Sequence, residues 1–323
     1  MQQISLVAGA GGFIGGHLVQ QLMADGHRVR AVDRKPLDQW YQLFPGAENL
    51  SADLSLRPAC QKAVSGVTTV FNLAADMGGM GYIESNKAAC MLNVLINTHL
   101  LMAAQEAAVA RFFFASSACV YAADKQLTAA IPPLKEADSY PAMPEDGYGW
   151  EKLFGERMCR HFREDFGLQT RMARYHNVYG PHETYFGGRE KAPAAICRKV
   201  AQAVLSGSNE IEIWGDGEQT RSFTYIDDCI KGSLLVTAGA YAEPVNVGSS
   251  EMVTINQLVS HVEKIAGVRM LRRYDLDAPC GVRGRNSDNT LIQSLYDWQP
   301  STPLIRGLEV LYRWVFDQLK RGS

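Results

Sequence analysis

The stretch that organises this chain runs Ile4-Ser5-Leu6-Val7-Ala8-Gly9-Ala10-Gly11-Gly12-Phe13-Ile14-Gly15-Gly16, and Val29-Arg30-Ala31-Val32-Asp33 comes after it. Residues 4–8 and 29–33 have the apolar character of buried strands, and residues 17–25 have the spacing of a helix before Gly26 stops it. The order is strand, glycine-rich loop, helix, strand. This order predicts the first unit of a parallel α/β sheet.

The glycine spacing and the acidic strand end indicate what the loop binds. Gly9, Gly12 and Gly15 follow a GxxGxxG pattern, which lets the backbone approach a pyrophosphate at a helix N-terminus. Asp33 can accept a hydrogen bond from a ribose hydroxyl, and its charge would repel a 2′-phosphate. The sequence therefore predicts a dinucleotide site that prefers NAD to NADP.

Strand and helix patterns alternate from residue 4 to about residue 177, which requires a parallel sheet with right-handed crossovers. We expect an α/β fold, a doubly wound parallel sheet (Rossmann) with a smaller, mixed substrate-binding lobe. The predicted NAD-binding domain comprises residues 1–177 and 222–250, and the predicted substrate lobe comprises residues 178–221 and 251–323. Further expected strands are 69–75, 111–115, 168–173, 211–214 and 245–248, and further expected helices are 85–107, 192–205, 226–236, 254–266 and 304–319.

Composition narrows the class of protein. A net charge of −2 gives no electrostatic reason to expect nucleic acid or an anionic membrane as partner. The seven cysteines are scattered without a CxxC pair, which argues against a disulfide framework or a structural zinc site. We expect no basic-then-apolar leader, no metal site and no apolar run of the roughly 18 residues that a membrane helix needs. A cytoplasmic protein is the expectation.

A second group of residues carries chemistry. Ser117 follows the short apolar strand at 111–115, and Tyr148 and Lys152 stand at i and i+4, on one face of a helix. A neighbouring ammonium favours the phenolate and so is expected to lower the pKa of the Tyr148 phenol. A tyrosine held in this way can take a proton from a substrate hydroxyl while hydride leaves the same carbon.

Several loops admit two interpretations each. Residues 76–82 form either a surface turn or a ligand-binding loop rich in glycine and methionine, and Asp53 either caps the adenine side or only ends a surface strand. The basic residues Arg221, Arg283 and Arg285, with Lys191 and Lys199, are either solvated or anchor a phosphorylated ligand. Cys119 is either a small buried hydrophobe or an acid/base group whose thiolate Lys191 would favour.

The chain also resembles a known family. The residues that carry the resemblance are the glycine loop, Asn72-Leu73-Ala74-Ala75, Ser117 with Tyr148-x-x-x-Lys152, and Arg174-x-x-Asn177-x-Tyr179-Gly180-Pro181. Together they resemble the extended short-chain dehydrogenase/reductases that act on nucleotide sugars, over essentially the whole chain. Within that group, the runs 74–81, 116–119, 187–195, 219–223 and 281–289 are similar to the GDP-mannose 3,5-epimerases.

That resemblance implies a reaction and a set of residues. It implies inversion of carbons 3 and 5 of the hexose of GDP-mannose through a transient 4-keto intermediate, with NAD recycled in place, in a homodimer. The implied catalytic residues are Ser117, Cys119, Tyr148, Lys152 and Lys191. The cofactor contacts are Gly9, Gly12, Phe13, Ile14, Gly15, Asp33, Asp53, Met77, Tyr148 and Lys152. The substrate contacts are Gly78, Ser117, Cys119, Asn177, Glu190, Lys191, Ala192, Lys199, Gln219, Thr220, Arg221 and Arg285.

Three alternatives remain open. A nucleotide-sugar 4-epimerase would leave Cys119 and Lys191 idle, and a 4,6-dehydratase would need a carboxylate near Cys119, which the order Ser117-Ala118-Cys119 does not offer. A non-catalytic NAD-binding regulator would need only the cofactor loop, and intact Ser117, Tyr148 and Lys152 count against it.

Overall fold

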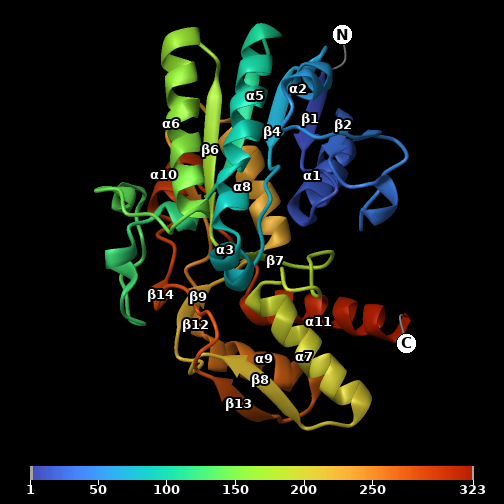
Figure 1. The fold of residues 1–323 in the computed structure, drawn as a ribbon, viewed down its shortest axis with the longest axis vertical. Coiled ribbons are helices and arrows are strands. Elements are labelled where there is room, and N and C mark those ends of the chain that lie inside the picture. The colour runs from blue at the N-terminus through green and yellow to red at the C-terminus, as the bar shows by residue number, and fades with distance from the viewer. Residues whose placement is uncertain (1–2, 322–323) are drawn as a thin grey trace.

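The computed structural model describes residues 3–321, and a seven-stranded sheet forms its larger part (Figure 1). The strand order is β11-β6-β5-β4-β1-β2-β3, and every pairing is parallel, which confirms the predicted doubly wound sheet. The strands are β1 (Ile4–Ala8), β2 (Arg28–Asp33), β3 (Glu48–Ser51), β4 (Thr69–Asn72), β5 (Arg111–Ser117), β6 (Thr170–Tyr175) and β11 (Val245–Val247).

The strand order reverses beside β1, which pairs with β2 on one side and β4 on the other. Ala8, the last residue of β1, lies between Val32 of β2 and Asn72 of β4. The carboxyl ends of the central strands therefore meet at one edge. In open α/β sheets, ligands bind outside that edge, at the point where the order reverses.

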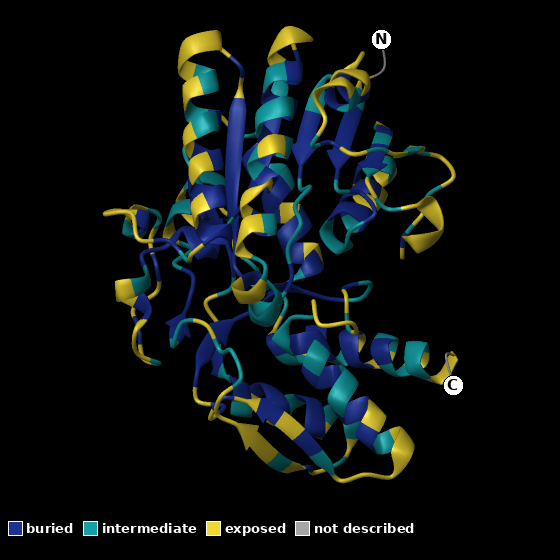
Figure 2. Ribbon diagram, in the orientation of Figure 1, coloured by how far each residue is buried: buried dark blue, intermediate teal, exposed yellow. Residues whose placement is uncertain are grey.

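Helices cover both faces of the sheet, and the alternation of side chains along a strand explains why. Phe113 of β5 faces the core beneath α1 (Phe13–Ala24) and α8 (Ile226–Ala238), whereas Phe112 and Phe114 face the core beneath α2 (Arg57–Val64), α5 (Asn93–Glu106) and α6 (Tyr148–Phe166). A strand buried on both faces reads as a continuous apolar run, as residues 111–115 do. Figure 2 shows the central strands buried, whereas the edge strand β3 is intermediate to exposed.

Three predicted elements differ from the structure by three residues or more. Helix α1 begins at Phe13 rather than at residue 17, because the glycines of the loop also form its first turn. Strand β4 ends at Asn72, so residues 73–75 lie in the loop that follows it. The single helix expected at 85–107 is three, α3 (Met80–Ser85), α4 (Lys87–Met91) and α5, because the chain turns at Asn86 (φ −130°, ψ 40°) and breaks again at Leu92.

The segment Lys87–Glu106 also corrects an expectation about length. Over the described residues, it is long and apolar enough, by length and composition only, to cross a membrane, although no such run was expected. Buried helices of globular folds meet the same criterion, and α5 packs against α2 and α6 in the layer that covers the sheet.

The smaller lobe lies below the carboxyl edge of the sheet (Figure 1). Its core packs α7 (Ala192–Ser206), α9 (Ile255–Ala266) and α11 (Leu304–Arg321) together with β8 (Glu210–Trp214), which pairs with β13 (Leu271–Asp275). Short strands connect the two parts: β7 (Val178–Tyr179) with β10 (Thr224–Tyr225), and β9 (Thr220–Ser222) between β12 (Met252–Thr254) and β14 (Gly284–Arg285).

The predicted division into domain and lobe stays a prediction, with one observation against its detail. Helix α10 (Thr290–Tyr296) contacts β11, and Ile292 and Trp298 belong to the core under the sheet. This short segment was assigned to the lobe, but it packs with the larger domain.

Candidate active site

A cleft of about 800 Å³ runs along the carboxyl edge of the sheet and is closed on its far side by the smaller lobe. Of the residues predicted for the site, all except Thr220 line this cleft. Residues separated by more than 250 positions, such as Gly9 and Arg285, therefore share one cavity. The Thr220 hydroxyl instead donates to the Ala129 carbonyl (2.6 Å).

The glycine loop at one end of the cleft fits a dinucleotide. An ideal Cβ placed on Gly15 would lie 2.1 Å from the Gly9 carbonyl oxygen, so only glycine allows helix α1 to start this close to β1. No side chain of residues 3–321 caps the first turn of α1 and no acidic residue lies in it, so the N–H groups at Phe13, Ile14 and Gly15 can meet a pyrophosphate. Gly12 is the N-cap.

Two carboxylates mark the adenosine side of the cleft. Asp33 ends β2, where its Oδ1 accepts from the Lys35 N–H (3.0 Å). Asp53 accepts from the Ser55 N–H (2.9 Å), and hydrogen bonds from Ser55 hold the pKa of Asp53 below its usual value. Both side chains line the cleft, so the residues present fit NAD.

A group of polar residues crosses the cleft between the two parts of the molecule. This group, called the strap below, consists of Asp76, Arg34, Tyr82 and Arg189. Asp76 contacts Arg34 (3.0 Å) on one side and Arg189 (2.6 Å) on the other, and it also accepts from the Tyr82 hydroxyl (3.0 Å). The Gly79 N–H donates to the Arg189 carbonyl (3.0 Å), and a Cβ on Gly79 would lie 2.3 Å from the Glu190 oxygen. Met77 and Gly78, predicted contacts, therefore lie in a loop fixed against residues 189–190.

Ser117, Tyr148 and Lys152 come together at the centre of the cleft. Ser117 ends β5, Tyr148 begins α6, and Lys152 lies one turn further along that helix. The Lys152 Nζ is 5.5 Å from the centroid of the Tyr148 ring and 4.8 Å from that of Phe114. It also lies 3.5 Å from Glu151 Oε2.

The electrostatics of Tyr148 differ from the expectation. Burial raises the pKa of Tyr148 well above the usual tyrosine value, the charges of Glu151 and the nearby thiols add to this, and the hydrogen bond with Ser117 opposes it. The expected lowering by Lys152 is therefore not the dominant effect here. The phenol is held protonated.

Cys119 is positioned by the turn that follows β5. It lies in the 3₁₀ turn η2 (Ala118–Val120), is 7% exposed, and its N–H donates to Ser117 Oγ (3.2 Å). Its nearest cation is Arg285, whose Nη1 lies 3.7 Å from Sγ, rather than the expected Lys191. Burial raises the pKa of the Cys119 thiol to about 12, so the thiol rather than the thiolate is its resting form.

The arginines of the lobe already form hydrogen bonds or ion pairs with other residues of the protein. Arg285 Nε donates to Gln126 Oε1 (2.7 Å) and its guanidinium pairs with Glu145. Arg221 donates to three carbonyls, and burial lowers its pKa to about 10. Arg283 pairs with Asp216 on the exposed side of the lobe. Arg221 and Arg285 line the cleft, and their predicted contact with a nucleotide stays a prediction.

The start of α7 supplies the remaining predicted contacts. Lys191 is the N-cap of α7 and Ala192 its first residue, while Glu190 pairs with Arg198 (3.0 Å). The charge of Lys191 acts on Glu183, a fully buried carboxyl whose pKa burial raises to about 8. Lys199, about two turns further along α7, donates to the Glu212 carbonyl (2.8 Å).

Asn177 and Gln219 complete the wall of the cleft. Asn177 has a positive φ of 43°, and its side chain donates to the Ser222 carbonyl (3.1 Å). Gln219 Nε2 donates to the Trp214 carbonyl (3.0 Å), whereas its Oε1 is buried and has no hydrogen-bond partner among residues 3–321.

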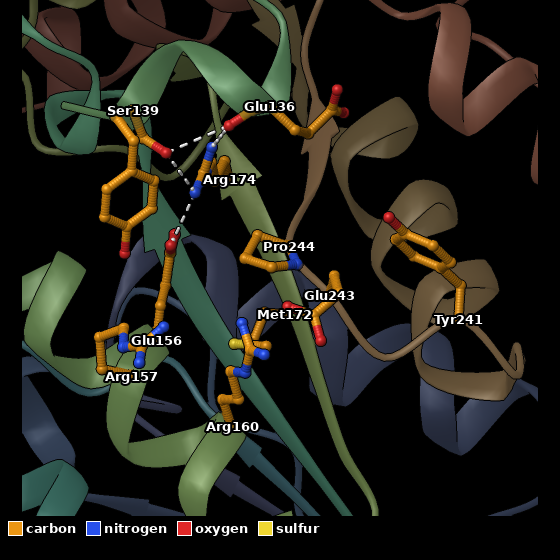
Figure 3. A pocket seen from close by; sticks show the side chains of 11 residues that line it. Glu136, Ser139, Glu156, Arg157, Arg160, Met172, Arg174, Tyr241, Glu243 and Pro244 are labelled. Atoms are coloured by element: carbon orange, nitrogen blue, oxygen red, sulfur yellow. Dashed lines mark hydrogen bonds and ion pairs between the residues drawn. The ribbon is translucent and has the colours of Figure 1, made fainter. Parts of the chain in front are cut away.

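A second, smaller cavity of about 180 Å³ lies on the other side of β6 (Figure 3). Arg174 enters it and is held by Glu156 (2.7 and 2.8 Å) and Ser139 (3.1 Å). Because this guanidinium is already satisfied, Arg174 of the family motif joins β6 to α6 rather than contacting the cleft.

Four residues near the reacting groups were not predicted: Glu145 and Gln126 beside Arg285, Glu183 beside Lys191, and Arg189 in the strap. The partners of Glu145, Gln126 and Arg189 are more than 100 positions away, so no spacing in the chain pointed to these three residues. Glu183 is only eight positions from Lys191, but the loop between them has no periodic pattern. Within residues 3–321, no group of three or more histidine, cysteine or acidic residues could hold a metal ion.

Comparison with known proteins agrees with this geometry. The sequence model of the NAD dependent epimerase/dehydratase family matches residues 5–248. GDP-mannose 3,5-epimerase 1 of Oryza sativa subsp. japonica is 46% identical over 98% of this chain and 82% of its own length.

Two solved structures share the fold. UDP-glucose 4-epimerase of Thermotoga maritima has a TM-score of 0.87 at 25% identity, covering 98% of this chain and 100% of its own. UDP-glucuronic acid 4-epimerase of Bacillus cereus, solved with UDP-glucuronic acid and NAD, has a TM-score of 0.84 at 26% identity over the same shares. The chain is an NAD-dependent nucleotide-sugar epimerase and belongs to the NAD dependent epimerase/dehydratase family.

Proposed function

We propose that this enzyme inverts carbons 3 and 5 of the hexose of GDP-mannose, giving GDP-L-galactose, GDP-L-gulose or both. The observation that carries the proposal is that Cys119 and Lys191, two acid/base groups, line the same cleft as the Ser117, Tyr148 and Lys152 group. The similarity to the rice GDP-mannose 3,5-epimerase supports the choice of substrate.

The glycine loop and Asp33 would hold NAD in the cleft, where the bound cofactor would supply a reversible hydride acceptor for carbon 4 of the sugar. Tyr148 takes the proton of the 4-hydroxyl as a phenolate, so its own proton must first leave to solvent. Ser117 holds the same oxygen by a hydrogen bond, and Lys152 lies beside the phenol. The resulting 4-keto group makes the hydrogens on carbons 3 and 5 acidic, because each carbanion is delocalised as an enolate.

Inversion at those carbons needs one group to remove a proton and another to add one on the opposite face. Cys119 and Lys191 are the candidates, because one comes from the turn after β5 in the domain and the other from the start of α7 in the lobe. Two groups on separate walls of a cleft can address opposite faces of one ring.

The three alternative functions make different demands on Cys119 and Lys191. A plain 4-epimerase or a non-catalytic NAD-binding regulator has no use for Cys119 and Lys191. A 4,6-dehydratase needs a carboxylate at the reacting carbon. Glu145 does lie near Cys119, but it pairs with Arg285 and does not line the cleft. The carboxylate is therefore behind the thiol, where it cannot reach a sugar carbon.

Incubation with GDP-mannose in deuterated water tests the proposal, with NMR used to locate the label. We expect deuterium at carbons 3 and 5. Tyr148→Phe should retain NAD and abolish label entry, and Cys119→Ser should slow label entry while still allowing oxidation at carbon 4. Unlabelled product inverted only at carbon 4 would establish the plain 4-epimerase instead.

We further propose a homodimer that pairs through α4, α5 and α6. Met91, Leu92, Leu95, Trp150 and Phe154 are 40–60% exposed on these helices. Figure 2 shows exposed residues along the same outward side. Large apolar side chains exposed together on neighbouring helices are typical of an interface. Sedimentation velocity showing only monomer at micromolar concentration would contradict it.

The proposed compartment is the cytoplasm. All seven cysteines are free thiols, which suits a reducing environment. Cell fractionation tests this assignment.

A further inference from the structure

Glu145 is tied to Cys119 through both its backbone and its side chain. Its N–H donates to the Cys119 carbonyl (3.0 Å), which fixes the loop before α6 against the turn after β5. Its carboxylate, 10% exposed, pairs with the Arg285 guanidinium. The charge of Arg285 holds the pKa of Glu145 below its usual value although burial opposes this, so Glu145 is an anion.

Arg285 joins that anion to the thiol. Gln126 Oε1 accepts from its Nε (2.7 Å), Glu145 accepts from Nη2, and Nη1 lies 3.7 Å from Cys119 Sγ. The second oxygen of Glu145 is buried and has no hydrogen-bond partner among the described residues. The thiol thus faces one cation and one anion, and the anion keeps an unused acceptor.

Burial is the largest cause of the raised pKa of the Cys119 thiol, and the charges beside the thiol act in addition to burial. A lone arginine beside a cysteine favours the thiolate, because it stabilises the negative form. Glu145 offsets that charge, and the negative charge of Glu145 raises the pKa of Cys119. Three further groups act directly on Cys119: Ser117 of β5, Tyr148 of α6 and Arg221 of β9. Glu151 of α6 and Cys90 of α4 act on Tyr148, which packs beside the thiol.

We propose that Glu145 is a positioning residue that, by neutralising Arg285, keeps Cys119 a protonated thiol, so that Cys119 enters the reaction as the proton donor. This rests on the proposed function for its catalytic consequence. The S–H bond breaks as a C–H bond forms on one face of the enolate, and Arg285 stabilises the thiolate left behind until it regains a proton from water. Before that step, Lys191 as the neutral amine has removed the proton from the opposite face of the same carbon, which forms the enolate and leaves Lys191 an ammonium until it returns the proton to water.

Alkylation of the whole protein by iodoacetamide tests the inference without turnover. The rate at the Cys119 peptide is followed by mass spectrometry over a range of pH, and Cys280, which lines the same cleft, is the internal reference. Glu145→Gln keeps an oxygen for Arg285 but removes the charge. It should lower the thiol pKa by about one to three units, and alkylation at neutral pH should be about threefold to thirtyfold faster.

The matched control is Asp146→Asn, which removes the same charge one position along. Asp146 is exposed and pairs with Lys87, so Cys119 should alkylate at the unmodified rate. An equal increase in both variants, or none in Glu145→Gln, would overturn the inference. The unmodified protein gives a second measurement, because a Cys119 alkylation rate that levels off below about pH 8.5, the usual thiol pKa, would overturn it without any variant.

The pH dependence of deuterium entry separates this inference from the proposed function. In Glu145→Gln, the pH profile should move to lower pH together with the alkylation profile. A shift in alkylation with an unchanged exchange profile would retain the role of Glu145 at the thiol and reject Cys119 as the group that reacts with the sugar.

Discussion

Replacing Gly15 with alanine should push the start of helix α1 away from the glycine loop and so weaken the binding of NAD. A Cβ at this position would lie 2.1 Å from the Gly9 oxygen, 2.7 Å from the Gly9 carbonyl carbon and 2.8 Å from the Ala10 Cα. These are backbone atoms, and the N–H groups of Gly9 and Ala10 both donate to the Val32 carbonyl of β2 (2.8 and 3.1 Å). The loop cannot move without breaking its connection to the sheet, so α1 must move instead.

The size of the effect follows from that displacement. Ordinary contact begins at 3.4 Å, so the start of α1 must retreat by about 1.3 Å. Such a shift takes the N–H groups of its first turn out of hydrogen-bond range of a pyrophosphate, and each such bond to a charged group is worth about 1.5–3 kcal/mol. We expect NAD to bind about tenfold to a hundredfold more weakly.

Gly16→Ala is the matched control, because it lies on the same turn of α1 and gains the same helix propensity, about 1 kcal/mol. Its Cβ would meet the Gln42 side chain, which can change rotamer. Isothermal titration calorimetry with NAD on cofactor-free protein measures both variants. Affinities within twofold of the unmodified protein for Gly15→Ala would refute the reasoning.

Two further predictions concern NAD release and acid stability. Asp76→Ala removes both ion pairs of the strap, so NAD should dissociate about fivefold faster in stopped-flow fluorescence, whereas Asp216→Ala, whose pair with Arg283 is outside the cleft, should leave that rate unchanged. Burial lowers the pKa of His176 to about 3, so the unfolded chain binds the proton first as the pH falls. Stability should therefore fall from about pH 6.5 down to about pH 3, by up to about 1.4 kcal/mol per pH unit, and urea titrations of His176→Gln should show a flatter dependence. An equal slope in both proteins would contradict this assignment.

Local patterns were sufficient for the elements that bind and orient the cofactor. The GxxGxxG spacing, the acidic end of β2 and the apolar run of β5 each depend on residues a few positions apart, and the backbone period converts that spacing into a loop, a strand end or a buried strand. The same holds for Tyr148 and Lys152, which one helical turn places on one face.

Local patterns gave a wrong prediction where the sequence contains no glycine or proline to signal a break in a helix. Residues 85–107 show apolar helical spacing throughout, yet the chain breaks at Asn86 and Leu92. The Asn93 side chain, freed to face the loop after β4, both accepts from the Asp76 N–H (2.7 Å) and donates to the Asp76 carbonyl (3.1 Å). A tertiary contact with the strap, not propensity, decided that geometry.

The sequence by itself determined the parallel sheet, the dinucleotide loop and the tyrosine–lysine pair, because each depends on the spacing of residues that are close together along the chain. Only the tertiary structure decided which charge lies beside Cys119. Arg285 is 166 positions away and Glu145 lies in another loop, and the fold brings both to the thiol while leaving Lys191 beside Glu183. Electrostatic energy depends on distance in space and on burial, and neither can be obtained from separation along the chain.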